Sequence, residues 1–329
     1  MDTTTQPRTA DSPTGSAEHV TELAAPADRA YRLIENVGRW PLLFAPCIWS
    51  QELERTDGVQ RIRLWAVVGL EVRSWTSRRE LDPAGRRIGF AQENPAPPLT
   101  AMTGHWLFED GSPGRLELGH RWSTAGDPHA ADRIAAALDA NSNTEIAALR
   151  SWAERAEEPD SLILAFSDHE TVDAPAADVY EFLYRADLWP EYLPHVAGID
   201  LETVPADDTT AGADVQTMDM QTSAADGSTH FTQSVRLCFG KERIVYKQTT
   251  PPRGLLAHTG EWLVTRGPDG TRVTARHTVA IDPGAVEDVF GAGTTVAQAK
   301  VRARDIIGAN SRGTLRAMRD RLGGTGGGR

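Results

Sequence analysis

The chain has 329 residues, of which 40% are hydrophobic, and a formal net charge of −12. This length and composition suit two globular domains with cores of ordinary size. The acidic balance argues against nucleic acid or an anionic membrane as a partner, and no stretch reaches the ~18–20 apolar residues of a membrane span. Two cysteines at unmatched positions, Cys47 and Cys238, predict no disulfide framework and a cytoplasmic protein.

The first half opens with a polar segment, 1–17, which we expect to be a flexible tail rather than a signal peptide. Pro26 suits the start of a helix, and Trp40-Pro41 ends that helix because the residue before proline is pushed out of helical geometry. A second short helix covers about 41–45. Turn signals then bound six predicted strands, at 47–55, 60–68, 71–82, 86–94, 100–109 and 114–124. A long helix closes the half, from 128 to 157, because apolar residues recur there at helical spacing.

The second half repeats this order after a linker at 157–161. A helix begins near Pro175, and the closing helix runs from 295 to 322. Between them we predict six strands, at 197–205, 212–222, 228–239, 242–250, 255–265 and 270–281. The glycine-rich end, 323–329, is expected to be a second flexible tail.

An internal repeat explains this doubled order. Residues 19–46 and 168–195 match at a spacing of 149 residues, in their Ala-Pro, Tyr and Trp-Pro positions. Ala140-Asn-Ser142 matches Ala309-Asn-Ser311 at a spacing of 169, so the second half carries an insertion near 291–293. A repeat of this size is a domain, since solenoid repeats run at roughly 20–50 residues. We therefore predict two domains, 18–157 and 158–322.

Each half places a short helical segment before several antiparallel strands and one long helix, which is an α+β pattern. We predict two tandem helix-grip domains, in which a curved antiparallel sheet wraps around the long C-terminal helix. Such a sheet leaves a cavity against the helix, open at one end, of the kind that small ligands occupy.

The element order, with Ala-Pro, Tyr and Trp-Pro near the start of each half and Asn-Ser in the last helix, resembles the polyketide aromatase/cyclases. These belong to the START-like (Bet v 1-like, SRPBCC) superfamily, and the duplication resembles the di-domain members of bacterial type II polyketide synthases. The resemblance spans about 18–322. It implies an enzyme of antibiotic biosynthesis that receives a poly-β-ketone on an acyl carrier protein, closes its first ring by aldol reaction and helps dehydrate it to an arene.

The resemblance also implies that closure joins the seventh and twelfth carbons of a chain already reduced at the ninth. It implies work alongside the other synthase components, and by family resemblance alone a homodimer. We expect no cofactor and no metal, because phosphate-binding glycine loops and metal-ligand clusters are absent from the sequence. Asp168-His-Glu170 is interpreted as a solvated strand edge rather than a metal site.

An aldol closure needs a bent chain, a polarised carbonyl and a proton transfer, in a site that holds the reacting carbons together. On the strand 72–80, alternation places Trp75, Ser77 and Arg79 on one face. They match the pattern W-x-S-x-R that lines the pocket in single-domain relatives. The resemblance implies that Arg79 binds a carbonyl or enolate oxygen, Ser77 donates a hydrogen bond and Trp75 supports the ring. The alternative is that this strand is solvated and its arginines point outward. Arg78, which lies on the other face, fits that interpretation.

Further candidates lie on the next strands and on the helices. His120 is a candidate general acid or base, or else a histidine with an ordinary structural partner. The remaining candidates for substrate binding could equally be core or structural residues, and in the first half they are Trp40, Trp106, Trp122 and Asn141. In the second half they are Trp189, Tyr192, Gln233, Trp262, Arg276 and Asn310.

The second half departs from the pattern of the chemical strand. Aligned on the neighbouring residues, Val235 stands where Arg79 stands, and Arg236 is displaced by one place, which turns it to the other face unless a bulge intervenes. His258 precedes Gly260 and Trp262 on an expected inward strand, so it ranks above His230 and His277 as the catalytic candidate. We therefore expect the first domain to perform cyclisation and the second to have another role or none.

Two other classes of function stay open on the sequence. A binding or carrier protein of the same superfamily would hold a lipid or an aromatic polyketide in a mostly apolar cavity. A non-catalytic subunit would only stabilise a synthase complex, with both pockets inactive.

Overall fold

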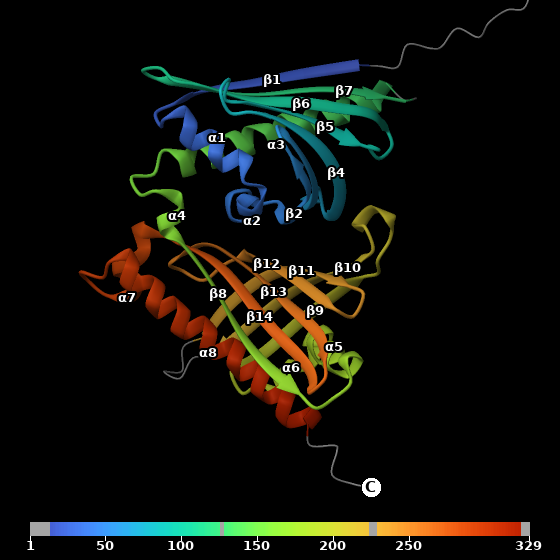
Figure 1. Ribbon diagram of the computed structural model, residues 1–329, viewed down its shortest axis with the longest axis vertical. Helices are drawn as coiled ribbons and strands as arrows, with labels where there is room; N and C mark the ends of the chain where they lie inside the picture. Colours follow the sequence, from blue (N-terminus) through green and yellow to red (C-terminus); the bar gives the residue numbers. More distant parts are fainter. Residues whose placement is uncertain (1–13, 126–127, 224–228, 324–329) are drawn as a thin grey trace, which may run out of the picture. The chain divides into compact units, whose positions relative to one another are not determined.

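The computed structural model describes residues 14–125, 128–223 and 229–323. The predicted helix-grip architecture is confirmed in both halves, since each has a seven-stranded antiparallel sheet and a long C-terminal helix (Figure 1). Contacts divide the chain into two compact units, and everything from Arg155 onward belongs to the second. No helix in these ranges has the length and apolar character needed to cross a membrane.

In the sheet of the first domain, the strand that comes first in the sequence lies beside the strand that comes last. Its sheet order is β1-β7-β6-β5-β4-β3-β2, so the first strand in sequence pairs with the last. The helices are α1 (Ala27–Glu35), the 3-10 turn η1 (Val37–Arg39), α2 (Trp40–Leu43) and α3 (Pro128–Ala153). The strands are β1 (Thr14–Leu23), β2 (Cys47–Thr56), β3 (Val59–Val68), β4 (Glu71–Asp82), β5 (Arg87–Glu93), β6 (Leu99–Glu109) and β7 (Gly114–Thr124).

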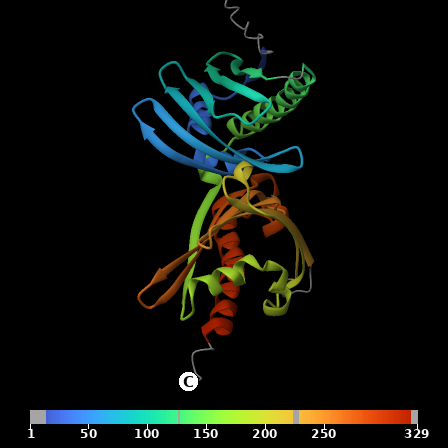
Figure 2. The ribbon, with the colours of Figure 1, turned by 90° about the vertical axis from the view of Figure 1, so that its right-hand side faces the viewer.

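The second domain has the corresponding order, β8-β14-β13-β12-β11-β10-β9, and its strands curve around α8 (Figure 2). Its helical elements are α4 (Pro159–Leu162), α5 (Ala176–Tyr184), η2 (Ala186–Leu188), α6 (Trp189–Tyr192), η3 (Asp208–Thr210), η4 (Pro283–Ala285), α7 (Val286–Phe290) and α8 (Val296–Leu322). Its strands are β8 (Ile163–Val172), β9 (Val196–Val204), β10 (Ala213–Ser223), β11 (Thr229–Phe239), β12 (Arg243–Thr250), β13 (Leu255–Gly267) and β14 (Gly270–Ile281).

Local sequence explains where the elements begin and turn. Pro26 immediately precedes α1, and Gly58 has a φ of 71° in the tight turn between β2 and β3, where a residue without Cβ is favoured. At the start of α8, the Thr295 side chain accepts a hydrogen bond from the backbone N–H of Gln298. The Gln298 side chain accepts one from the backbone N–H of Thr295, and the two bonds form a capping box. The residues of the predicted insertion, 291–293, directly follow the short helix α7.

Two strands were not predicted. Thr14–Leu23 includes residues assigned to a flexible tail, and of Ile163–Val172 only 168–170 are interpreted from the sequence as the edge of a strand. In both strands half-buried and exposed positions alternate. Few of the half-buried positions in Thr14–Leu23 carry large apolar side chains, and its largest apolar residue before Leu23, Val20, is 53% exposed. Hydrophobic periodicity therefore cannot reveal this edge strand.

Candidate functional site

The second domain encloses a cavity of about 320 Å³ between the concave face of its sheet and helices α7 and α8. Much of its wall is apolar, with contributions from Trp189, Leu193, Met218 and Phe290. Ile306 lines the cavity and is 58% exposed, so the cavity opens beside α8. Its size and largely apolar lining suit a small organic ligand.

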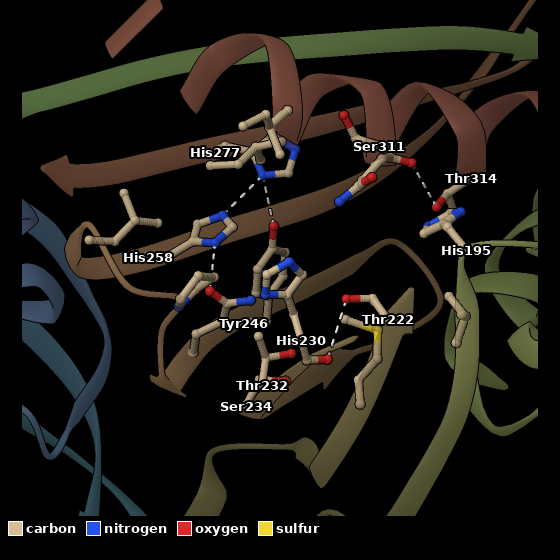
Figure 3. A pocket seen from close by; sticks show the side chains of 18 of the residues that line it. His195, Thr222, His230, Thr232, Ser234, Tyr246, His258, His277, Ser311 and Thr314 are labelled. Atoms are coloured by element: carbon tan, nitrogen blue, oxygen red, sulfur yellow. Dashed lines mark hydrogen bonds between the residues drawn. The ribbon is translucent and has the colours of Figure 1, made fainter. Parts of the chain in front are cut away.

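A cluster of polar side chains lies on one side of this cavity (Figure 3). The Nδ1 atom of His258 is 2.8 Å from Oε1 of Gln248, and its Nε2 atom is 3.2 Å from Nδ1 of His277. The Tyr246 hydroxyl oxygen is 2.9 Å from the same His277 nitrogen. Four side chains from three strands thus form one connected network on the cavity wall.

Strand register and one glycine bring these groups together. Gln248 pairs with His258, and Gly260 pairs with Tyr246 on one side and His277 on the other. A Cβ atom at Gly260 would overlap the Tyr246 ring. The glycine therefore permits the tyrosine to cross the strand and reach the histidine.

With the Gln248 oxygen facing His258, one assignment of the protons satisfies all three hydrogen bonds of the network. The Gln248 oxygen only accepts, so His258 carries its proton on Nδ1 and accepts on Nε2. His277 then donates from Nδ1, and this proton is shared between His258 and the Tyr246 oxygen. The Tyr246 hydroxyl proton is left free for a partner in the cavity.

Burial keeps all three rings neutral. Burial, followed by the neighbouring His277, lowers the pKa of His258 to about 3. Burial also lowers the pKa of His277 to about 4, and it raises the pKa of Tyr246 above its ordinary value. At neutral pH the tyrosine is thus a proton donor and the histidines are uncharged.

A second set of contacts supports His277 from behind. Its ring stacks on Phe166 with centroids 4.8 Å apart, and the Arg304 guanidinium lies 4.2 Å from the centroid of the Phe166 ring. Asp168 accepts hydrogen bonds from Arg304 at 2.8 and 3.2 Å and from the Ser311 hydroxyl at 3.0 Å. The predicted solvated edge is therefore wrong for Asp168, whose side chain is 9% exposed because it anchors α8.

The first domain carries different groups at the matching register positions. Phe90 pairs with Gly104 as Tyr246 pairs with Gly260, and His120 pairs with Gly104 as His277 pairs with Gly260. Met102, two residues before Gly104, matches His258. The first domain thus lacks the hydroxyl and the second imidazole of the network.

His120, a predicted catalytic residue, lies beside Phe90 and α3. Its Nδ1 atom is 3.4 Å from the Ser142 hydroxyl oxygen, and its ring meets Phe90 edge-on with centroids 5.4 Å apart. Burial and the nearby His19 and His105 lower its pKa to about 4. Its catalytic role stays a prediction.

Arg79 has a structural environment in place of the predicted substrate contact. Its side chain is 1% exposed and donates to the carbonyl oxygens of Ile34 at 2.6 Å and Glu35 at 3.4 Å, and to Gln60. These are the last carbonyls of α1, which have no partner inside the helix. The guanidinium therefore caps the C-terminus of α1, which does not support its contact with a substrate oxygen.

Arg236 is the counterpart of Arg79, and the predicted match with Val235 is wrong. Arg79 pairs with Phe90 on the next strand, and Arg236 pairs with Tyr246. Arg236 donates to the carbonyls of Leu183 at 2.5 Å and Tyr184 at 3.5 Å, at the end of α5. The second half has one more residue than the first between its buried glutamine, Gln60 or Gln216, and its arginine, which restores the inward direction.

Several other predicted residues lie in the core or at its margin in the first half of the chain. Ser77, Trp106 and Trp122 are buried, and Trp75 and Trp40 are half-buried. Trp40 meets Phe44 edge-on at 5.6 Å. Asn141, a predicted substrate-binding residue, has an exposed side chain, while its neighbour Ser142 is buried.

In the second domain the predictions separate into two groups. His258, Trp189, Trp262 and Asn310 line the cavity. Gln233, Arg276 and Tyr192 do not line it. Gln233 and Arg276 lie on the opposite strand face, where they contact Thr250 at 3.1 Å and Glu261 at 3.2 Å. Tyr192 packs on Phe182 and under Arg321.

The sequence reasoning missed Tyr246 and Gln248 and ranked His277 too low. A signal was available, because RIGFAQE (87–93) matches RIVYKQT (243–249) and LTAMTGHW (99–106) matches LLAHTGEW (255–262). The differences Phe90 to Tyr246 and Met102 to His258 mark the place where the domains diverge. Within the described ranges no group of three or more His, Cys, Asp or Glu is arranged to hold a metal ion.

Comparison with known proteins shows what this chain is similar to. Two family models, both described as polyketide cyclase/dehydrase and lipid transport, match residues 23–150 and 164–323. The chain is 47% identical over 305 residues to the actinorhodin polyketide synthase bifunctional cyclase/dehydratase of Streptomyces coelicolor, covering 91% of this chain and 94% of the relative. It is 42% identical over 303 residues to the granaticin polyketide synthase bifunctional cyclase/dehydratase of Streptomyces violaceoruber, covering 91% and 92%.

Two crystal structures resemble most of the chain. The di-domain ARO/CYC BexL from the BE-7585A biosynthetic pathway shares 42% identity, with a TM-score of 0.78, covering 94% of this chain and 98% of that one. The di-domain ARO/CYC StfQ from the steffimycin biosynthetic pathway shares 34% identity, with a TM-score of 0.75 and the same coverage of 94% and 98%.

Proposed function

The chain belongs to the di-domain aromatase/cyclases, the bifunctional cyclase/dehydratases of polyketide synthases, and on this premise we propose that its second-domain cavity dehydrates a newly closed ring. The observation that carries the proposal is the network of Tyr246, His277, His258 and Gln248 on the cavity wall. It presents one free hydroxyl proton to a largely apolar cavity.

Loss of water from a cyclised β-hydroxy ketone breaks the C–H bond beside the carbonyl, whose electron pair forms the new C=C bond, and breaks the C–O bond of the hydroxyl group, which leaves as water once it has taken a proton. The Tyr246 hydroxyl is suited to donate it, because burial keeps the phenol protonated at neutral pH. As that proton leaves, the N–H group at His277 Nδ1, whose nitrogen is 2.9 Å from the Tyr246 oxygen, stabilises the phenolate, and the phenolate then takes the proton of the broken C–H bond, which regenerates the phenol. His258 and Gln248 hold His277 in the donating tautomer.

We further propose that the substrate is a poly-β-ketone carried on an acyl carrier protein and that the first ring joins the seventh and twelfth carbons of a ketoreduced chain. The two-domain architecture and the similarity to cyclase/dehydratases of named polyketide synthases support this assignment. Homodimer formation is proposed on family resemblance alone. Ser77, His120 and Asn310 remain candidates for substrate contact.

A direct test replaces Tyr246 with the residue that the first domain carries at the same position. Tyr246→Phe removes one oxygen atom and keeps the ring packing. In a minimal synthase reconstituted with its ketoreductase, we expect the variant to slow dehydration about 10²-fold, as for loss of a general acid. The measurement is the ratio of aromatised to merely cyclised product by mass spectrometry.

Tyr192→Phe is the matched control, because Tyr192 does not line the cavity. Unchanged dehydration in Tyr246→Phe would contradict the assignment of the acid. A product profile unchanged by omitting the whole protein would instead support the alternative of a carrier for a lipid or an aromatic product, which the apolar wall could also hold.

A further inference from the structure

The inner face of α3 carries a carboxyl group that the proposed function has not used. Glu145 shares a helix face with Ser142, Ile146 and Leu149, which recur at helical spacing. These three residues are 1%, 7% and 0% exposed. Glu145 therefore lies on the helix face that packs against the first sheet. Its side chain is only half-buried, so solvent reaches part of it.

Glu145 corresponds to a residue on the wall of the second cavity. The 169-residue spacing between Ser142 and Ser311 also relates Glu145 to Thr314, Ile146 to Leu315 and Leu149 to Met318. Both Ser311 and Thr314 line the second-domain cavity. The equivalent position in the first domain thus carries a carboxyl in place of a hydroxyl.

The carboxyl of Glu145 is not engaged elsewhere in the part of the chain that the structure describes. Charged or titratable side chains reach α3 from neighbouring elements at His19 on β1, Arg29 on α1 and His120 on β7, and they contact Asp139, Ala153 and Ser142. None of them contacts Glu145. An unpaired inner carboxyl has a desolvation cost that a purely structural residue has no reason to carry.

We infer that Glu145 is the proton acceptor for ring closure in the first domain, an inference that rests on the proposed function. Its carboxylate takes a proton from the methylene carbon between two carbonyls, and the C–H electron pair moves to the carbonyl oxygen as an enolate. The enolate carbon bonds to the acceptor carbonyl carbon. The resulting alkoxide takes the proton back from the Glu145 carboxyl, so the residue is regenerated.

The two domains then hold complementary equipment. The first lacks the Tyr246 hydroxyl and the His258 imidazole but has a base, and the second has a proton donor but a hydroxyl at the position of that base. Burial raises the pKa of Glu145 to about 7, which matches a base that works near neutral pH.

The test is Glu145→Gln in the full chain, in the reconstituted synthase with ketoreductase. We expect first-ring closure to slow about 10²-fold and spontaneously cyclised products to increase, because an amide cannot accept the proton. The rate of the unmodified protein should rise with pH through about 7, and the rate of the variant should be flat. Asp132→Asn, an exposed acid on the same helix, should change neither.

The outcomes separate this inference from the proposed function. Closure rate and pH profile unchanged in Glu145→Gln, while Tyr246→Phe still loses dehydration, would overturn Glu145 as the base and leave the second site standing. If Glu145→Gln left the closure rate unchanged and Tyr246→Phe left dehydration unchanged, both the inference about Glu145 and the proposed function of Tyr246 would be overturned. If Glu145→Gln does not fold, Glu145→Asp provides the check, with a reduced closure rate that must still rise with pH.

Discussion

At the scale of single residues, two buried arginines do the same work in two domains. Arg79 and Arg236 each cap the carbonyl end of the first helix of their domain, with 1% of each side chain exposed. Burial lowers the pKa of Arg79 to about 9, so the hydrogen bonds to Ile34 and Glu35 have to offset a desolvation cost. A charged group held in this way is a structural requirement of the helix end.

We predict that Arg79→Met lowers the free energy of unfolding by about 3 kcal/mol, because it removes charge-assisted hydrogen bonds and leaves buried carbonyls unpaired. Urea unfolding monitored by tryptophan fluorescence measures the change. Arg78→Met, an exposed neighbour, should shift stability by about 0.5 kcal/mol or less. A stable but inactive Arg79→Met protein would instead return Arg79 to a role in substrate binding.

At the scale of elements, α8 is attached to the second sheet through Asp168 on β8. Burial opposes ionisation of this carboxyl, but the hydrogen bonds from Arg304 and Ser311 outweigh it and hold its pKa below the usual range. The same attachment supports His277, because Arg304 lies over the Phe166 ring on which His277 stacks. One carboxylate thus connects the position of the helix with the orientation of a cavity histidine.

We expect Asp168→Asn to lower the free energy of local unfolding of α8 by about 1–3 kcal/mol, because charge-assisted hydrogen bonds become neutral ones. Amide hydrogen exchange along α8 should accelerate in the variant at neutral pH. In the unmodified protein the same contribution is lost as pH falls through the depressed folded-state pKa of Asp168. Asp305→Asn, an exposed acid on α8, is the control, and equal exchange in both variants would contradict the anchoring role.

At the scale of the molecule, both domains bury histidines in their neutral form. Burial is the largest cause that lowers the pKa of His120 and His277 to about 4 and of His258 to about 3, from 6.5. Below pH 6.5 the unfolded chain binds protons that the folded chain excludes. Stability is therefore fully present above about pH 6.5 and is lost as pH falls towards 4.

The melting temperature should accordingly decline between about pH 6.5 and pH 4, with each of the three histidines contributing up to one proton to the slope. Replacing His120 with Asn should make the decline shallower, because one proton-binding site is removed from the unfolded state. Calorimetric melting at several pH values gives both slopes. Parallel curves would show that His120 does not contribute.

The sequence by itself determined the architecture of both domains except for the first strand of each sheet. Turn residues, strand alternation and helical spacing are local properties, so the predicted strands from 47 to 124 and the closing helices fall within a few residues of the observed ones. The repeat in Ala-Pro, Tyr and Trp-Pro showed the duplication, because the same local signals recur at one spacing.

Only the tertiary structure decided which side chains meet. A single extra residue before Arg236 reverses the face of every side chain that follows it, so sequence alignment alone matched Val235 with Arg79. Tyr246, His258 and His277 lie on three strands and come together only through the register around Gly260. Register is a long-range property set by pairing across the sheet, which no local pattern in the chain contains.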